Sequence, residues 1–313
     1  MPDTPPAARP VLPKGITIFE RGWLSSNNIL LSSPEASALV DSGYVTHSEQ
    51  TLALVDDALD GDALDVLVNT HLHSDHCGGN AAFQQAYPGM TTFIPPGHSE
   101  HVSQWDPYAL TYAPTGQSCP QFKFDAVLVP SSEIRLGGRQ WQIHTAPGHD
   151  PHSVILFEPE QRILISADAL WERGFGVVFP ELEGLDAYAA VGDTLTLIES
   201  LEPRIVIPGH GSAFSHAAES IAFARERLDA FVRNPEKHIR YAAKVLLKFK
   251  LLEVQSVKRT AFVAWATATP YFKLIFDQRY PGEDFSLWIN QLIDELVRSG
   301  AAAQQAQMIA NAG

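Results

Sequence analysis

The chain has 313 residues, 45% of them hydrophobic and 19% charged, which is the composition of a globular protein long enough for one large domain or two. Acidic residues outnumber basic ones by 36 to 22, and the formal charge of −14 argues against a general nucleic-acid binder, whose surface should be basic. No apolar run is long enough to cross a bilayer, no secretory signal opens the chain, and two cysteines cannot form a disulfide framework. We therefore expect a soluble cytoplasmic protein with a small-molecule substrate and no membrane partner, its state as monomer or homo-oligomer left open.

The proline- and alanine-rich residues 1–14 are expected to be loosely held. After them, short runs rich in Ile, Leu and Val and bounded by turn residues predict strands within 15–20, 27–33, 36–43, 63–70, 91–96, 126–149, 152–170 and 203–210. Segments with helical patterns between the strands predict helices at 48–61, 78–89 and 184–201. Strands and helices mixed in this order favour layered sheets covered by helices.

The pattern changes near residues 232–238. Beyond this point the sequence shows no strong strand run, and helices are predicted at 236–254, 256–269 and 285–300. Residues 234–313 hold 10 of the 22 basic and 7 of the 36 acidic residues, a net charge of +3, which leaves −17 for residues 1–233. The two shifts together predict a catalytic domain at 15–233 and a small helical domain at 234–313.

The stretch THLHSDHCGGN follows the apolar run at 63–70 and crowds His71, His73, Asp75 and His76 into six positions. Neutral imidazoles and carboxylates are ligands that zinc accepts, and iron or manganese also. Three imidazoles beside one carboxylate need a common partner, because polar groups buried without partners destabilise a fold. The stretch therefore predicts part of a metal site.

Three further metal-capable residues each follow an apolar strand run: His149 in TAPGHD, Asp168 in ISADAL and His210 in IPGHG. Taken singly, the histidines would pass as loop residues and Asp168 as a helix N-cap. The carboxyl ends of strands are where sites form in layered α/β folds, so the three are expected to join the first cluster. Protein ligands with an open position would make the site catalytic.

These motifs, together with ALVDSG at residues 38–43, resemble those of the metallo-β-lactamase fold superfamily over residues 15–215. The resemblance implies an α/β fold, a four-layer αβ/βα sandwich with two divalent metal ions at one edge of its sheets. Zinc is the expected metal, with iron or manganese as alternatives. Residue by residue, the resemblance assigns His71, His73 and His149 to the first ion. It assigns Asp75, His76 and His210 to the second ion, and Asp168 as the carboxylate that bridges both. The chain departs from the family pattern at two positions. Ala167 stands where the family often has Gly before the bridging Asp, and His152 stands where a small residue usually follows His149.

Paired ions about 3.5–4 Å apart share a water molecule and lower its pKa toward neutrality. The resemblance therefore implies a metal-dependent hydrolase, similar to glyoxalase II or a lactonase, in which a metal-bridging hydroxide attacks a small ester, lactone or thioester. Asp75 is the expected catalytic residue that orients the hydroxide. The alternatives are a metal-dependent nuclease or phosphodiesterase, a mononuclear iron persulfide dioxygenase, and a non-catalytic ligand-binding member of the fold.

Substrate contacts are expected from the segment after Asp168, where Trp171, Arg173 and Phe175 are close by chain connection, and from the long stretch 94–122. The C-terminal segment resembles, more weakly, the small winged-helix-like extensions of some family members. It carries a basic stripe at helical spacing: Lys237, Arg240, Lys244 and Lys248. The stripe is either a solvated helix face or a surface that holds an anionic group.

Overall fold

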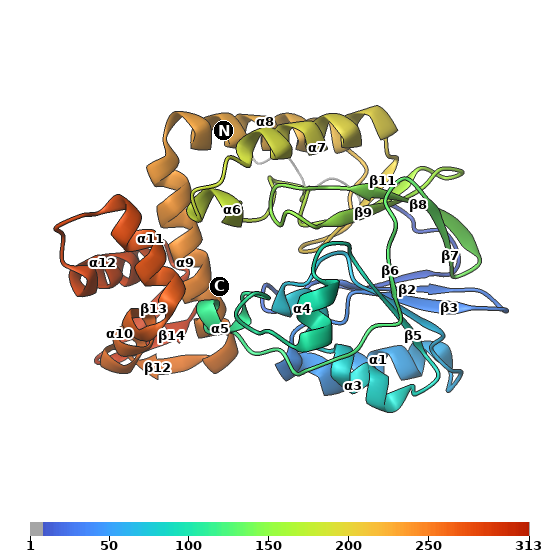
Figure 1. Cartoon of the computed structure of the whole chain (residues 1–313), viewed down its shortest axis with the longest axis horizontal. Helices are drawn as coiled ribbons and strands as arrows, with labels where there is room; N and C mark the ends of the chain where they lie inside the picture. Colours follow the sequence, from blue (N-terminus) through green and yellow to red (C-terminus); the bar gives the residue numbers. More distant parts are fainter. Residues whose placement is uncertain (1–8, 313) are drawn as a thin grey trace.

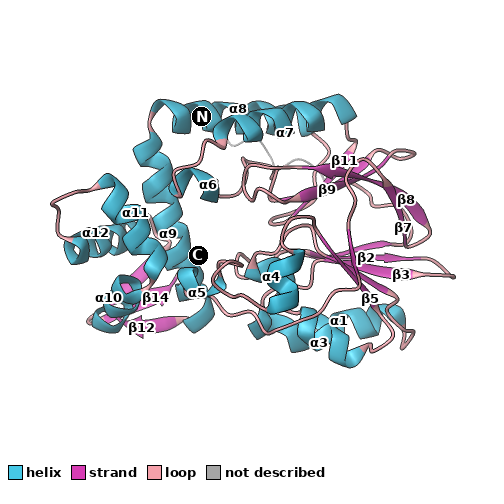
Figure 2. Ribbon diagram, in the orientation of Figure 1, coloured by secondary structure: helices cyan, strands magenta, loops and turns pink. Residues whose placement is uncertain are grey.

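The computed structural model describes residues 9–312, and Figures 1 and 2 show two stacked sheets with helices on both outer sides. Residues 9–13 have no regular secondary structure, whereas residues 1–8 of the segment expected to be loosely held lie outside the described residues. A third, smaller sheet and several helices form a separate lobe at the C-terminal end of the chain (Figure 2).

The first sheet has six strands in sequence order, joined antiparallel from β1 to β3 and parallel from β3 to β6. Its strands are β1 (Ile16–Phe19), β2 (Asn28–Ser32), β3 (Ser37–Val40), β4 (Val66–Val68), β5 (Thr91–Ile94) and β6 (Ala126–Val127). The second sheet has the order β11-β10-β9-β8-β7. Its strands are β7 (Glu133–Leu136), β8 (Arg139–Thr145), β9 (Val154–Glu158), β10 (Ile163–Ala167) and β11 (Ile205–Pro208).

Alternation along the strands divides the apolar side chains between inner and outer layers. On β2, Ile29 and Leu31 join the core between the two sheets, while Leu30 faces the core under the first sheet's helices. On β10, Ile165 joins the inner core and Leu164 the core under the second sheet's helices. Because successive strand residues point to opposite faces, strands that are apolar throughout are buried on both faces, and this builds four layers.

Helices cover both outer faces and are frequent in the connections. The first sheet is covered by α1 (Ser48–Leu59) and α3 (Asn80–Ala86), and the second by α7 (Tyr188–Leu201) and α8 (Ala217–Arg233). Shorter helical turns lie in the connections: η1 (Val45–His47), α2 (Ser74–Cys77), α4 (Ser99–Gln104), α5 (Tyr112–Thr115) and α6 (Phe179–Leu182).

The C-terminal lobe contains four helices and a three-stranded sheet of order β12-β14-β13. Its elements are α9 (Pro235–Val254), β12 (Ser256–Lys258), α10 (Arg259–Ala268), α11 (Pro270–Arg279), α12 (Phe285–Arg298), β13 (Ala302–Gln305) and β14 (Met308–Asn311). The single helix predicted over 256–269 is wrong at its start, because residues 256–258 pair with β14. Three-residue strands and a strand rich in Ala and Gln lack the apolar alternation that identifies a strand in sequence.

The helix α8 ends at Arg233 and α9 begins at Pro235, where the charge and composition change. The lobe has an apolar core of its own, yet that core includes Val177 and Leu182 from the segment around α6. The domain boundary between residues 233 and 234 therefore stays a prediction, and the two parts of the chain on either side of it pack against each other. Among residues 9–312, no helix has the length and apolar character needed to traverse a membrane.

Candidate metal centre and substrate cavity

The first histidine cluster occupies the turn after β4. His71 and His76 are fully buried, and α2 carries Asp75 and His76 on one helical turn. Their orientation depends on Asp41 at the end of β3. Its carboxylate accepts hydrogen bonds from Thr70 N (2.9 Å), from Thr70 Oγ1 (2.8 Å) and from Nδ1 of His76 (2.8 Å). The bond to Nδ1 directs Nε2 of His76 toward the other candidate ligands.

The sequence contained Asp41 in the ALVDSG motif but did not reveal this role. A strand-end aspartate serves many purposes, and only the fold shows which side chain it faces.

The seven candidate ligands converge where strands of both sheets end. Three groups of ligand atoms each lie within 4.8 Å of one another: His71, His73 and His149; His71, His76 and Asp168; Asp75, His76 and His210. Residues separated by more than a hundred positions come close, since His210 Nε2 lies 3.1 Å from Asp75 Oδ2. His73 Nδ1 lies 2.8 Å from His149 Nε2.

Asp168 lies between the two sets of histidines and faces each with one oxygen. Its Oδ2 is 3.4 Å from His149 Nε2, and its Oδ1 is 3.5 Å from His76 Nε2 and 3.8 Å from His210 Nε2. Trp171 Nε1 donates to Oδ1 at 3.2 Å. One carboxylate therefore approaches both sets of histidines, and its predicted role as a bridge stays a prediction.

Ala167 turns the chain so that Asp168 faces the centre. Its φ of 46° lies in the left-handed region, and the pairing of β10 with β11 shifts register between Ile165 and Ala167. A left-handed residue is strained unless it is Gly, so the Gly that the resemblance leads us to expect before Asp168 would be the unstrained residue here. The departure seen in the sequence therefore leaves the position of Asp168 intact.

Burial keeps two of the imidazoles in the neutral form that binds metals. It lowers the pKa of His71 well below the usual value and that of His73 to about 4, and the neighbouring histidines lower both further. For Asp168, burial alone would raise the pKa of the carboxyl, but the nearby His210 and His76 hold it well below its usual range. The neutral rings of His71 and His73 beside the ionised carboxylate of Asp168 are suitable ligands for a divalent cation.

The arrangement fits a bound cation on two further observations. Nε2 of His71 and Nε2 of His76 are buried and have no hydrogen-bond partner among the described residues. Glycines leave room at the centre, because a Cβ on Gly176 would lie 2.4 Å from His149 Nδ1 and one on Gly209 would lie 2.3 Å from Asp168 Oδ1. Orphaned buried nitrogens that point to a shared centre are explained by a metal ion.

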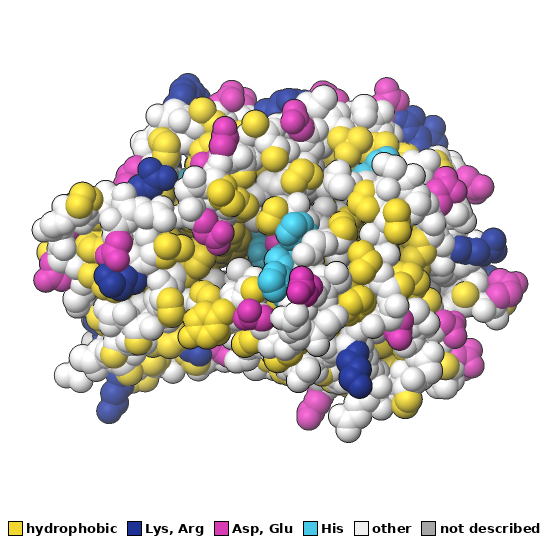
Figure 3. All heavy atoms as spheres, viewed as in Figure 1, with side chains coloured by type: hydrophobic (Ala, Val, Ile, Leu, Met, Phe, Trp, Pro, Cys, Tyr) yellow, Lys and Arg dark blue, Asp and Glu magenta, His cyan; other side chains and the backbone are white. Residues whose placement is uncertain are grey.

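A cavity of about 230 Å³ opens beside this centre. Hydrophobic and acidic side chains border the hollow, with histidines exposed in it (Figure 3). The stretch 94–122, expected to form a wall, contributes His98, Ala109, Thr111, Thr115 and Gln117. Trp171 also lines the cavity, beside Trp23, which stacks on His210 with ring centroids 5.2 Å apart.

The other two predicted substrate contacts lie elsewhere. Arg173 is exposed, with its guanidinium 5.9 Å from the ring centre of Phe223, and it does not line the cavity. Phe175 is 1% exposed and packs with Phe231 in the core under α8. Phe175 turns away from the cavity because it belongs to the second sheet's outer core, and Arg173 turns to the surface beside Phe223.

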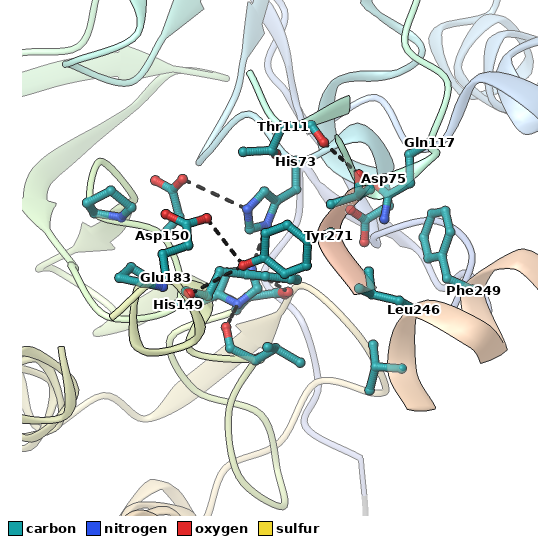
Figure 4. A pocket seen from close by; sticks show the side chains of 18 of the residues that line it. His73, Asp75, Thr111, Gln117, His149, Asp150, Glu183, Leu246, Phe249 and Tyr271 are labelled. Atoms are coloured by element: carbon teal, nitrogen blue, oxygen red, sulfur yellow. Dashed lines mark hydrogen bonds and ion pairs between the residues drawn. The ribbon is translucent and has the colours of Figure 1, made fainter. Parts of the chain in front are cut away.

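The sequence did not identify the wall formed by the C-terminal lobe. Tyr241, Val245 and Phe249 recur every four residues on α9 and face the cavity, together with Leu246. Figure 4 shows Leu246 and Phe249 projecting from this helix toward the site. The apolar face was visible in the sequence, but nothing there distinguished a cavity wall from an ordinary core face.

The basic stripe on α9 is not exposed to solvent along its whole length, and none of its side chains lines the cavity. Arg240 and Lys244 form ion pairs with Glu295 on α12, and Lys248 Nζ donates to the carbonyl oxygens of Ala301 and Ala312. Lys237 is exposed. Three of the four cations thus connect α9 to the rest of its own lobe.

Comparison with known proteins places this geometry in a family. The family model described as the metallo-beta-lactamase superfamily matches residues 21–210, more than half of the chain. The chain belongs to this superfamily. The resemblance inferred from the motifs is confirmed, as is the layered sandwich with a C-terminal helical region. Members are mostly metal-dependent hydrolases, and homologues bind divalent metals.

Three similar proteins give finer context. A hydroxyacylglutathione hydrolase from Anaeromyxobacter dehalogenans is 29% identical over 229 residues, which are 72% of this chain and 78% of that protein. A human acyl-coenzyme A thioesterase is 26% identical over 156 residues, 47% of this chain and 56% of that protein. A beta-lactamase domain protein from Burkholderia ambifaria matches in structure with a TM-score of 0.60 and 20% identity, covering 100% of this chain and 97% of that one.

Proposed function

We propose that the chain is a hydrolase that cleaves an ester, lactone or thioester of a small molecule at a site for two divalent metal ions. The observation that carries the proposal is the convergence of seven metal-capable side chains beside a cavity large enough for a compact substrate. The similar proteins named as hydroxyacylglutathione hydrolase and acyl-coenzyme A thioesterase support the choice of an acyl bond.

In this proposal His71, His73 and His149 would hold one ion and Asp75, His76 and His210 the other, and Asp168 would serve both. Such ions, when bound, lower the pKa of water and polarise the acyl carbonyl of a substrate. Zinc is the proposed metal, and iron or manganese would suit the same ligands.

The chain's own residues position the reactants. Asp75 lines the cavity with a side chain 15% exposed, so its carboxylate reaches the substrate space and can take a proton from the attacking water. The same carboxylate can return that proton to the leaving oxygen or sulfur, so that the acid and the alcohol or thiol are released. Val177 O accepts the Nδ1 proton of His149 at 2.6 Å, which fixes the orientation of that ring.

The test begins with the metal content of the purified protein, followed by hydrolysis rates on lactones, thioesters, aryl esters and phosphodiesters. We expect about two metal ions per chain and turnover of at least one carboxylic ester class. Asp75→Asn and His149→Ala should lose activity by a factor of about 100 or more, and His149→Ala should also lose metal. The matched controls are Asp277→Asn, on an exposed ion pair of α11, and His216→Ala, paired with Glu172.

Other results would point to the alternatives. Asp75→Asn and His149→Ala variants that match the wild type in both metal content and rate would refute the hydrolase. One iron per chain with oxygen consumption on persulfides would indicate a dioxygenase. Bound metal without turnover on the whole panel would indicate a ligand-binding protein, and turnover restricted to phosphodiesters a phosphodiesterase.

A further inference from the structure

The wall of the cavity opposite the candidate ligands is apolar and comes from the C-terminal lobe. From α9 it receives Tyr241, Val245, Leu246 and Phe249, and from α11 it receives Tyr271. Phe179 connects this wall to the candidate metal centre through two edge-to-face ring contacts. Its ring centroid lies 5.1 Å from that of His73 and 5.8 Å from that of Tyr271. A substrate that reaches the candidate ligands therefore lies against aromatic and aliphatic side chains.

The charged side chains on the cavity are all acidic among the residues that the structure describes. Besides Asp75 and Asp168, the lining contains Asp150 and Glu183 and no lysine or arginine. Glu183 is at the exposed rim, and its Oε1 accepts a hydrogen bond from Tyr271 Oη at 3.2 Å (Figure 4). Partial burial raises the pKa of Glu183, the hydrogen bond from Tyr271 lowers it, and the Asp150 carboxylate raises it again.

The nearest cations of α9 are committed to other partners. Arg240 and Lys244 pair with Glu295, as described above, and Lys250, which follows Phe249, pairs with Glu253. Lys248 has three oxygen acceptors on the C-terminal strands and their connections. None of these side chains lines the cavity, and each is engaged by a carboxylate or by other oxygen acceptors, so they do not pair with a group bound there.

We propose that the cavity selects esters, lactones or thioesters whose groups on both sides of the scissile carbonyl are compact, apolar and uncharged, and that Glu183 determines this selection by repelling anionic substrates. The inference rests on the proposed function and narrows it. Thioesters of anionic carrier thiols, the substrates named for the similar proteins, are then poor substrates here. A carboxylate or phosphate that lies against the apolar wall and the Glu183 carboxylate loses hydration and finds no lysine or arginine among the described lining residues, because the only cations of the site would be the proposed metal ions, which bind the reacting group.

The volume agrees with a compact substrate. At about 230 Å³ the cavity is smaller than the roughly 300–1,000 Å³ of pockets that take drug-sized ligands. The part of a substrate that enters this space is therefore about the size of an acyl group of a few carbons or a single aromatic ring.

The first experiment compares two thioesters of one acyl group, S-butyryl-N-acetylcysteamine and S-butyrylglutathione, on the metal-loaded full-length protein. The reacting bond is identical and only the charge and size of the thiol differ. We expect kcat/KM for the neutral thioester to exceed that for the anionic one by about tenfold or more. To separate charge from size, 4-nitrophenyl butyrate and 4-nitrophenyl hemisuccinate are compared in the same way. Equal or higher kcat/KM for both anionic substrates would overturn the inference.

Variants at Glu183 test whether that residue sets the preference. The ratio of kcat/KM for the hemisuccinate to that for the butyrate ester should rise about threefold to tenfold in Glu183→Gln and further in Glu183→Lys. Glu133→Gln, which makes the same charge change at an exposed position on β7, is the matched control and should leave the ratio unchanged. A ratio that moves equally in the control, or not at all in either Glu183 variant, would assign the selection to something other than Glu183.

Binding without turnover separates this inference from the proposed function. The thioethers S-butyl-N-acetylcysteamine and S-butylglutathione lack the scissile carbonyl, and calorimetry on the metal-loaded protein measures their dissociation constants. Tighter binding of the neutral thioether, with no thioester or ester hydrolysed, would refute the hydrolase and keep the selectivity. Hydrolysis of the esters with equal binding of both thioethers and equal kcat/KM would keep the hydrolase and refute the selectivity. Failure of both thioethers to bind at millimolar concentration would also refute the proposed selectivity.

Discussion

Replacement of His238 on α9 should change the pH dependence of stability in a direction that the structure defines. The ring is 1% exposed, lies between Phe231 and Tyr188, and accepts a hydrogen bond at Nε2 from Val178 N at 3.0 Å. Burial, with a smaller contribution from the Arg227 guanidinium, lowers the pKa of His238 to about 4. The folded protein therefore keeps this ring neutral at pH values where the unfolded chain protonates it.

The sign and size of the effect follow from proton linkage. Between the unfolded value near 6.5 and the folded value of about 4, the unfolded state binds the extra proton, so the stability from His238 is lost as pH falls. The loss amounts to about 2 kcal/mol between pH 7 and pH 5 and about 3 kcal/mol by pH 4. His238→Gln can still accept a bond from Val178 N but cannot titrate here, whereas His238→Ala leaves that buried N–H without a partner, at a cost of about 1–3 kcal/mol at every pH.

The assay is urea unfolding of wild type, His238→Gln and His238→Ala at several pH values from 7.5 to 4.5, with equal metal loading. The difference in free energy of unfolding between wild type and His238→Gln should shift by about 2 kcal/mol in favour of the variant between pH 7 and pH 5. His238→Ala should show the same shift from a lower starting value. A difference that stays flat over this range would show that the ring is not held neutral, and the reasoning from its burial would fail.

Three further predictions concern single side chains. Asp41→Asn should weaken metal binding about 10- to 100-fold, measured by competition with a chromophoric chelator, because the Asp41 carboxylate orients His76. An unchanged metal affinity would show that Asp41 does not have this role. Ala167→Gly should raise the free energy of urea unfolding by roughly 0.5–1 kcal/mol, the difference between relieved left-handed strain and the added entropy of Gly, and a loss of stability would contradict it. Lys248→Met should lower that free energy by about 1–3 kcal/mol, because it leaves carbonyl oxygens of the C-terminal lobe without a donor, whereas the exposed control Lys258→Met should have little effect.

Local patterns were sufficient for most of the sandwich. Apolar runs such as 27–33 and 163–167 keep both faces buried, and this property is written in consecutive residues, so β2 and β10 were predicted where they occur. The C-terminal strands escaped prediction for the opposite reason. β12 has three residues and becomes a strand only because β14 supplies hydrogen bonds from a distant part of the chain, whereas β13 is rich in Ala and Gln and pairs with β14 as the other strand of a hairpin.

The sequence by itself determined which residues could hold metal, because chemistry and position coincide: His, Asp and short glycine-containing turns at the ends of apolar strands must come together once those strands form sheets. Tertiary structure alone decided the surroundings of that centre. The contact of Asp41 with His76, the wall that α9 provides and the departure of Arg173 and Phe175 from the cavity all depend on which way a helix face or a loop turns after it packs. That choice depends on contacts between residues far apart in the chain, and no window of neighbouring residues contains it.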